Sequence, residues 1–219
     1  TSTMRDMTTL MHEGGHAVHN FLTMDLALNE FKSPPMEVAE LASMSMELLT
    51  MDQWDEFFSN PAELRRARME QLEDIVETLP WVATIDRFQH WIYENPHHTG
   101  DERRTAWKEI AGTYSDNVTD WSGLDQAMDF LWQKQLHLYE VPFYYIEYGM
   151  AQLGAVGIWR NYRKNQAGAL EGYKRALSLG YMRGIPAIYE AAGIRFSFSR
   201  EYIRELTGFI SMELDSLRD

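Results

Sequence analysis

Apolar side chains along the chain recur at intervals of three and four residues, which is the spacing of one face of a helix. The clearest example is residues 3–24, whose apolar positions include Met7, Leu10, Met11, Ala17, Val18, Phe21 and Leu22. The sequence lacks convincing runs of alternating β-branched residues, Asn-Gly hairpin signals and internal repeats. The pattern therefore predicts an all-α fold of many helices.

Proline and glycine mark where these helices begin and end. A proline pair precedes a predicted helix over about 36–51, and an Asn-Pro start precedes a long helix over about 61–93, with Pro80 as a potential break. Further helices are expected over about 101–116, 124–139, 142–163, 167–178, 185–192 and 199–217. Gly14 and Gly15 lie inside the first helix, where each costs about 1 kcal/mol relative to Ala. We therefore expect a substrate or a neighbouring backbone to approach them closely.

The length and composition favour one folded domain. The 219 residues are 45% hydrophobic and 13% aromatic, which is enough for one sizeable core. The formal charge of -13 argues against nucleic acid and anionic membranes as partners. No apolar run reaches the roughly 18 residues of a membrane span, and the first ten residues lack the features of a signal peptide. With no cysteine in the chain, these features predict a cytoplasmic protein.

The strongest chemical signal is the run His12-Glu13-Gly14-Gly15-His16. Four residues turn a helix by about 400°, so both imidazoles project from one face and are able to share a metal ion. Glu13 follows the first histidine beside that face, where it is placed to take a proton from a metal-activated water. Because the chain has no cysteine, His, Asp and Glu must supply all ligands.

A catalytic zinc site normally has three protein ligands, and the third must come from another element. The next predicted helix offers Glu37, Glu40 and Glu47, and spacing alone does not choose among them. His19 lies two turns after His12, so geometry also admits it as a ligand, although we expect it to support the site or to lie at the surface.

The remaining histidine-rich region contains His90, His97 and His98. Residues 96–99 are candidates for a second metal site or for a loop that faces the substrate. Their polar surroundings favour an ordinary exposed loop.

Residues 9–21, TLMHEGGHAVHNF, followed by residues 34–49, PPMEVAELASMSMELL, resemble the oligoendopeptidase F and thimet oligopeptidase family of zinc peptidases. In that family a second helix carries a pattern that opens with a glutamate ligand. The resemblance implies that Glu40 is the third metal ligand and that Glu47 supports the histidines. Glu37 falls outside the pattern and is expected on a solvated face.

A second match lies in residues 137–153, HLYEVPFYYIEYGMAQL, which are similar to the histidine and tyrosine segment of the same family. In the family this segment faces the zinc and binds the substrate. The resemblance implies that His137 binds the peptide and that Tyr145 and Tyr148 donate hydrogen bonds to the oxyanion. Tyr144 competes with Tyr145 for this role, because the family's spacing from the histidine varies.

The matches follow one another in family order along the whole chain, although full-length family members are much longer. The resemblance implies that residues 1–219 are a C-terminal catalytic domain of the zincin type, without the upstream part that builds the opposite wall of the channel. It further implies a zinc endopeptidase with one Zn²⁺ per chain, with oligopeptides as substrates and that upstream part as a further partner. The alternative is a helical zinc-binding or interaction module without turnover.

Overall fold

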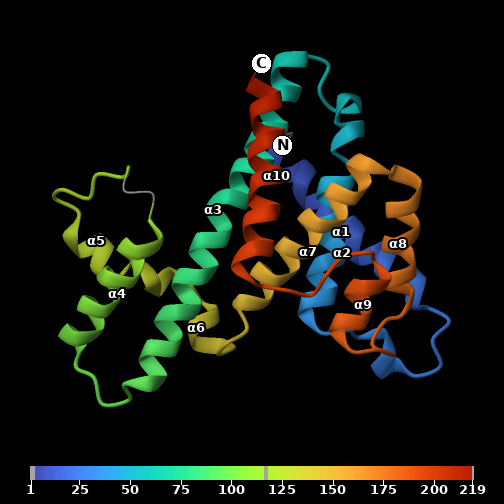
Figure 1. Cartoon of the computed structure of the whole chain (residues 1–219). Helices are drawn as coiled ribbons and strands as arrows, with labels where there is room; N and C mark the ends of the chain where they lie inside the picture. The colour runs from blue at the N-terminus through green and yellow to red at the C-terminus, as the bar shows by residue number, and fades with distance from the viewer. Residues whose placement is uncertain (1–2, 116–117, 219) are drawn as a thin grey trace. The chain divides into compact units, whose positions relative to one another are not determined.

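The computed structural model describes residues 3–115 and 118–218, which form helices and no strand. The α-helices are α1 (Met4–Thr23), α2 (Met36–Leu49), α3 (Pro61–Glu94), α4 (Gly100–Tyr114), α5 (Asp125–Asp129), α6 (His137–Glu140), α7 (Ile146–Lys164), α8 (Gln166–Ser178), α9 (Ile185–Ala191) and α10 (Arg200–Arg218) (Figure 1). Three short 3-10 helices lie between them: η1 (Asn29–Lys32), η2 (Met51–Glu56) and η3 (Leu131–Lys134). The all-α prediction is confirmed. None of the helices in the described ranges has the length and hydropathy that crossing a membrane requires.

Helix α3 runs without interruption through Pro80, so the potential break there does not occur. Three side chains beyond the proline, Val82, Ile85 and Phe88, are buried on one face of the helix. Their burial helps to offset the backbone hydrogen bond that proline removes.

Two predicted helices were wrong in their extent. The stretch 124–139 is divided into α5, η3 and α6, because Gln135 has an extended backbone with φ -89° and ψ 93° after η3. The helix expected over 142–163 begins only at Ile146, since Phe143 has a positive φ of 63° that no right-handed helix accepts. The predicted end of the helix over 101–116 lies outside the described residues.

The chain forms two compact units, one of residues 1–75 and 150–219 and the other of residues 76–149. The first unit contains the His-Glu-Gly-Gly-His segment, and the second contains His137 and the tyrosines that follow it. Each unit is described separately below.

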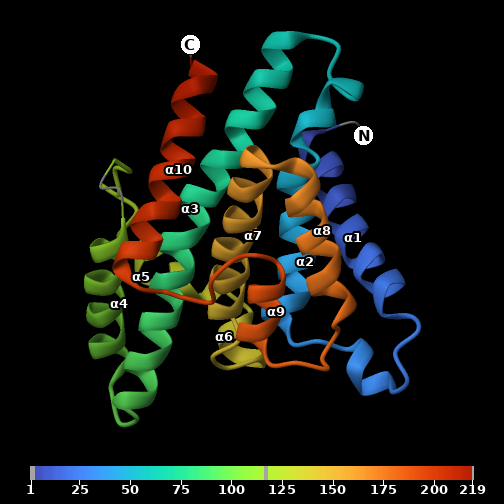
Figure 2. The same ribbon diagram turned by 45° about the vertical axis from the view of Figure 1, so that its right-hand side comes forward.

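In the first unit, α1, α2, α8 and α9 pack side by side (Figures 1 and 2). Two buried tyrosines tie α2 to the later helices. The Tyr173 hydroxyl of α8 donates to the Ala42 carbonyl at 2.7 Å, and the Tyr189 hydroxyl of α9 donates to the Glu37 carbonyl at 3.0 Å. Helix α2 is therefore fixed from one side by α1 and from the other by α8 and α9.

Gly15 is the point of closest approach between α1 and α2. A Cβ atom built on Gly15 would lie 2.4 Å from the Ser43 Cα atom and 2.7 Å from the Ala42 carbonyl oxygen. A Cβ atom built on Gly14 would have no contact within 4 Å apart from its chain neighbours and the nearby backbone of its own helix. The expectation of a close neighbouring backbone is thus confirmed for Gly15 but not for Gly14.

His19 lies on α1 beside α8 and is only 5% exposed, so the surface position considered for it was wrong. Burial and, to a smaller extent, His16 lower the pKa of its imidazole to about 4, although the Leu177 carbonyl acts in the opposite direction. Its Nε2 atom has no hydrogen-bond partner among the described residues. His19 is therefore a neutral core residue at physiological pH.

The second unit is built on a largely aromatic hydrophobic core, which consists of Ile85, Phe88, Trp107 and Trp132. The Phe88 ring centroid lies 5.1 Å from that of Trp107 and 5.4 Å from that of Trp132. Leu138 and Tyr145 pack against this core. The aromatic cluster therefore supports the segment that carries the candidate peptide-binding residues.

Replacing Gly15 with Ala is expected to lower the free energy of unfolding by about 3 kcal/mol, because the new methyl group would meet backbone atoms that cannot rotate away. Urea unfolding followed by circular dichroism measures this loss. Gly14→Ala is the matched control, and it should leave stability unchanged or raise it by up to about 1 kcal/mol. Equal losses in the two variants would contradict the close contact of α1 with α2.

A second prediction concerns acid stability, because His19 titrates near 6.5 when unfolded and about 4 when folded. Between these values the unfolded chain binds more protons at His19, so the contribution of His19 to the free energy of unfolding should fall by about 3 kcal/mol as the pH drops from 6.5 to 4. Unfolding of the metal-free chain at several pH values measures this slope. His19→Leu should flatten the slope, whereas the exposed control His97→Leu should not; identical slopes in all three proteins would refute the assignment.

Candidate functional site

His12 and His16 lie one turn apart on α1, with ring centroids 5.0 Å apart and ring planes at 83°. Glu40 approaches them from α2 and is 5% exposed. One ligand atom from each of these three side chains lies within 4.8 Å of the other two. The structure thus brings together the three residues expected to hold a metal. Among the described residues they form the one such group of His, Asp and Glu.

One distance within this group matches the spacing of two zinc ligands. The His12 Nε2 atom lies 3.4 Å from the Glu40 Oε2 atom. Two ligand atoms bound tetrahedrally at roughly 2.0–2.2 Å from zinc stand about 3.4 Å apart. Two imidazoles and one carboxylate are also a donor set that zinc accepts in catalytic sites. The residues present therefore fit a zinc ion.

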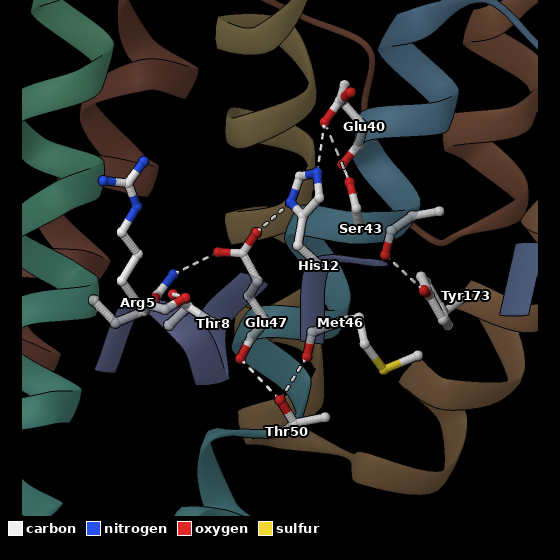
Figure 3. Close-up of polar contacts among 11 residues, drawn as sticks. Arg5, Thr8, His12, Glu40, Ser43, Met46, Glu47, Thr50 and Tyr173 are labelled. Carbon is white, nitrogen blue, oxygen red and sulfur yellow. Dashed lines mark hydrogen bonds and ion pairs between the residues drawn. The ribbon is translucent and has the colours of Figure 1, made fainter. Parts of the chain in front are cut away.

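Glu47 holds His12 from the other side of its ring (Figure 3). The His12 Nδ1 atom lies 2.7 Å from the Glu47 Oε1 atom, and the Gln71 side-chain amide donates to Glu47 Oε2 at 2.8 Å. A carboxylate only accepts hydrogen bonds, so His12 carries a hydrogen on Nδ1, and Nε2, which faces Glu40, is the nitrogen left for a metal ion. This matches the supporting position expected for Glu47. Gln71 was missed, because an isolated glutamine within a long helix has no recognisable pattern.

The two carboxylates make the environment of His12 strongly favourable for positive charge. Hydrogen bonds to Glu40 and then Glu47 raise the pKa of the His12 imidazole to about 10, although burial acts in the opposite direction. Ser43 adds a hydroxyl donor to Glu40 Oε2 at 3.3 Å (Figure 3). A metal cation bound to Nε2 would replace this proton, and two nearly buried carboxylates favour such a cation.

Glu13 lies next to His12 on α1, and its side chain is exposed to solvent. It makes no hydrogen bond or ion pair with the described residues. It is therefore free to contact water or a substrate, as a general base must be.

Glu37 differs from its expected position on a solvated face. Its side chain is half-buried, and its Oε2 atom has no solvent contact and no partner among the described residues. Glu37 lies one turn before Glu40, where the packing of α9 against α2 through Tyr189 shields it. It is not a member of the group formed with His12 and His16.

In the second unit, His137 is surrounded by three tyrosine rings. Its ring centroid lies 4.9 Å from that of Tyr145, 5.6 Å from that of Tyr148 and 5.9 Å from that of Tyr144. Burial raises the pKa of Tyr145, so its hydroxyl keeps its hydrogen. The structure brings the expected group together, and Tyr144 stays an alternative to Tyr145 because both rings contact His137.

A strained residue precedes these tyrosines. Phe143 has a φ of 63°, which is costly for a residue with a bulky side chain. Its backbone N–H donates to the Oε1 atom of the buried Gln89 at 2.9 Å, and its ring packs against His90 and Tyr93. Such strain is typical of functional segments, and here it sets the turn that leads into α7.

The histidines near residue 97 do not form a second metal group. Arg103 Nε donates to His98 Nε2 at 2.7 Å, and His98 Nδ1 contacts the Asn95 carbonyl. His90 lies 3.6 Å from Asp86, and His97 is exposed. The expectation of an ordinary polar loop is consistent with these contacts.

Comparison with known proteins bears directly on the resemblance. The model of peptidase family M3 matches residues 2–208. A homolog of oligoendopeptidase F from Borreliella burgdorferi is 24% identical over 183 residues, which are 81% of this chain and 30% of that protein.

Solved structures of similar proteins agree with this result. A structure of Pz peptidase A with an inhibitor is 32% identical with a TM-score of 0.89, and the match covers 98% of this chain and 38% of that one. A protein assigned as oligoendopeptidase F from Bacillus anthracis is 27% identical with a TM-score of 0.78, over 98% of this chain and 35% of that one. The chain thus spans 30% to 38% of the length of these relatives. Since the family model covers nearly all of its residues, the chain belongs to peptidase family M3.

Proposed function

We propose that the chain is the catalytic part of a zinc-dependent endopeptidase that hydrolyses internal bonds of oligopeptides. The observation that supports this most strongly is the group of His12, His16 and Glu40, with ligand atoms within 4.8 Å of one another. Membership of a peptidase family supports the same reaction class. One zinc ion per chain would be held by these three side chains, with Glu47 orienting His12 from behind.

The chemistry follows from the roles available to the residues of the first unit. When bound, zinc supplies a Lewis acid that polarises a carbonyl group and lowers the pKa of water toward ~7. Glu13 takes the proton from the attacking water and later passes it to the leaving amine. Its exposed carboxylate, adjacent to the first ligand, supports this role.

The second unit contributes substrate binding in this proposal. His137 donates a hydrogen bond to the peptide backbone, and the hydroxyls of Tyr145 and Tyr148 stabilise the oxyanion of the tetrahedral intermediate. Preorganised donors of this kind contribute about 3 kcal/mol to transition-state stabilisation. The raised pKa of Tyr145 supports a donor role, while Tyr144 is the alternative donor.

The extent of the active protein is also a proposal. We infer that residues 1–219 act as one catalytic domain to which both compact units contribute. Because the relatives are longer, a further part of the same protein is proposed to complete the wall of the peptide-binding channel. The acidic composition argues against nucleic acid and anionic membranes as partners. A cytoplasmic location stays a prediction.

The alternative is a helical zinc-binding or interaction module without turnover. Bound zinc without hydrolysis of any peptide, in this chain and in a longer relative alike, would support the alternative.

Glu13→Gln is expected to reduce hydrolysis of a quenched fluorescent oligopeptide about a thousandfold, because the amide cannot accept a proton from water. Zinc content, measured by mass spectrometry, should stay equal to that of the unchanged protein. The matched control is Glu30→Gln, which removes the same charge from an exposed position on η1. Near-normal turnover of the Glu13 variant would refute its role as general base.

Glu47→Gln is expected to weaken zinc binding about tenfold to a hundredfold. The carboxylate accepts from both His12 and Gln71, whereas an amide offers only one oxygen to these two donors. Competition with a coloured chelator measures the affinity. Glu37→Gln on the same helix is the control and should bind zinc normally; equal weakening in both variants would show a general effect of charge.

A further inference from the structure

Two side chains form a directed series of hydrogen bonds that ends on His137. Trp81 Nε1 donates to Gln135 Oε1 at 3.0 Å, and Gln135 Nε2 lies 2.7 Å from His137 Nδ1. All three residues belong to the second unit. The whole series of hydrogen bonds therefore lies within the second unit.

The indole group fixes the direction of the series. An indole N–H donates a hydrogen bond and cannot accept one, so the Gln135 atom that faces Trp81 must be the carbonyl oxygen. The amide NH₂ group of Gln135 then faces His137. This removes the usual ambiguity between the oxygen and the nitrogen of a glutamine side chain.

The amide group in turn fixes the state of His137. An amide NH₂ group donates and cannot accept, so His137 Nδ1 must offer its lone pair. A neutral imidazole with an unprotonated Nδ1 carries its hydrogen on Nε2. His137 is thus a hydrogen-bond donor through Nε2, the nitrogen that Gln135 does not occupy.

The surroundings hold each member of the series in place. The Trp81 ring contacts the Trp107 ring edge to face at 6.0 Å, and Lys134 Nζ lies 4.2 Å from the centre of the Trp81 ring. The rings of Tyr145 and Tyr148 lie against His137 and limit its rotation. A ring flip would place a carbon against the Gln135 amide and lose the 2.7 Å hydrogen bond.

We propose that Gln135, oriented by Trp81, is a positioning residue that holds His137 as an Nε2–H donor for a carbonyl oxygen of the peptide substrate. This inference rests on the proposed role of His137 in peptide binding. It also separates two functions: His137 donates a hydrogen bond, and proton transfer from water is left to Glu13.

The test exchanges the donor that faces His137 for an acceptor of the same shape. In Gln135→Glu, the carboxylate accepts from both Trp81 and His137, so Nδ1 must become protonated. Nitrogen-15 NMR of the imidazole reports this directly: His137 Nδ1 should resonate as an unprotonated nitrogen in the unchanged protein and as a protonated one in the variant. His137→Asn assigns the signals by removing them.

Peptide hydrolysis and zinc content complete the experiment. Gln135→Glu should lower kcat/KM for a quenched fluorescent oligopeptide about tenfold to a hundredfold, the usual effect of losing an orienting partner. Zinc content should not change. The control Gln133→Glu places the same charge on an exposed residue two positions earlier, and it should retain normal hydrolysis and a normal His137 spectrum.

Three results would overturn the inference. The first is a protonated Nδ1 on His137 in the unchanged protein. The second is normal hydrolysis by Gln135→Glu when NMR shows that His137 of this variant carries a hydrogen on Nδ1 and none on Nε2. The third is an equal loss of hydrolysis in the Gln133→Glu control. If the unchanged protein binds zinc but cleaves no peptide, the proposed endopeptidase function fails, and the NMR result alone then decides whether Gln135 sets the state of His137.

Discussion

The close contact of α1 with α2 at Gly15 is the constraint on which the candidate metal centre depends. The missing side chain of Gly15 lets the two helix backbones approach until a Cβ atom would not fit. At this separation the short carboxylate side chain of Glu40 reaches the imidazoles of His12 and His16. If the helices lay farther apart, the three candidate ligands could not all contact one metal ion. The glycine in the motif is thus a packing residue that makes coordination geometrically feasible.

The contact also places two carboxylates around one imidazole, an arrangement that is costly without a cation. Glu40 is nearly buried, and both it and Glu47 lie within hydrogen-bonding or ion-pair distance of His12. Removing two negative charges from water is unfavourable unless donors and a positive charge offset the loss. Gln71 and Ser43 supply donors, and the remaining charge is supplied by a proton or a metal. The same electrostatics that raise the pKa of His12 thus favour a dication.

The sequence predicted the helical fold and two of the three grouped candidate ligands because both have local patterns: apolar spacing for helices, and the His-Glu-Gly-Gly-His motif for His12 and His16. The third ligand needed a family resemblance, since spacing alone left Glu37, Glu40 and Glu47 equivalent. The hydrogen bonds of Gln71 and Gln135 could not be predicted from the sequence. Gln71 bonds to a residue 24 positions away in the chain, and Gln135 bonds to a residue 54 positions away. The extended backbone of Gln135, which divides the stretch 124–139, likewise has no local signal in the sequence.

His12 and His137 differ in the group that faces the Nδ1 atom, and this difference suits them to the different roles proposed for them. The Nδ1 atom of His12 faces an acceptor, Glu47, so it carries a hydrogen, and Nε2 is the nitrogen on which a metal ion would replace a proton. Behind His137 stands a donor, the amide of Gln135, so the lone pair lies on Nδ1 and the Nε2 hydrogen is available to a carbonyl oxygen. An imidazole is chemically the same in both places, and its neighbour decides whether it offers electrons or a hydrogen. A carboxylate and an amide of nearly equal shape thus suit one histidine to the proposed metal and the other to the proposed substrate.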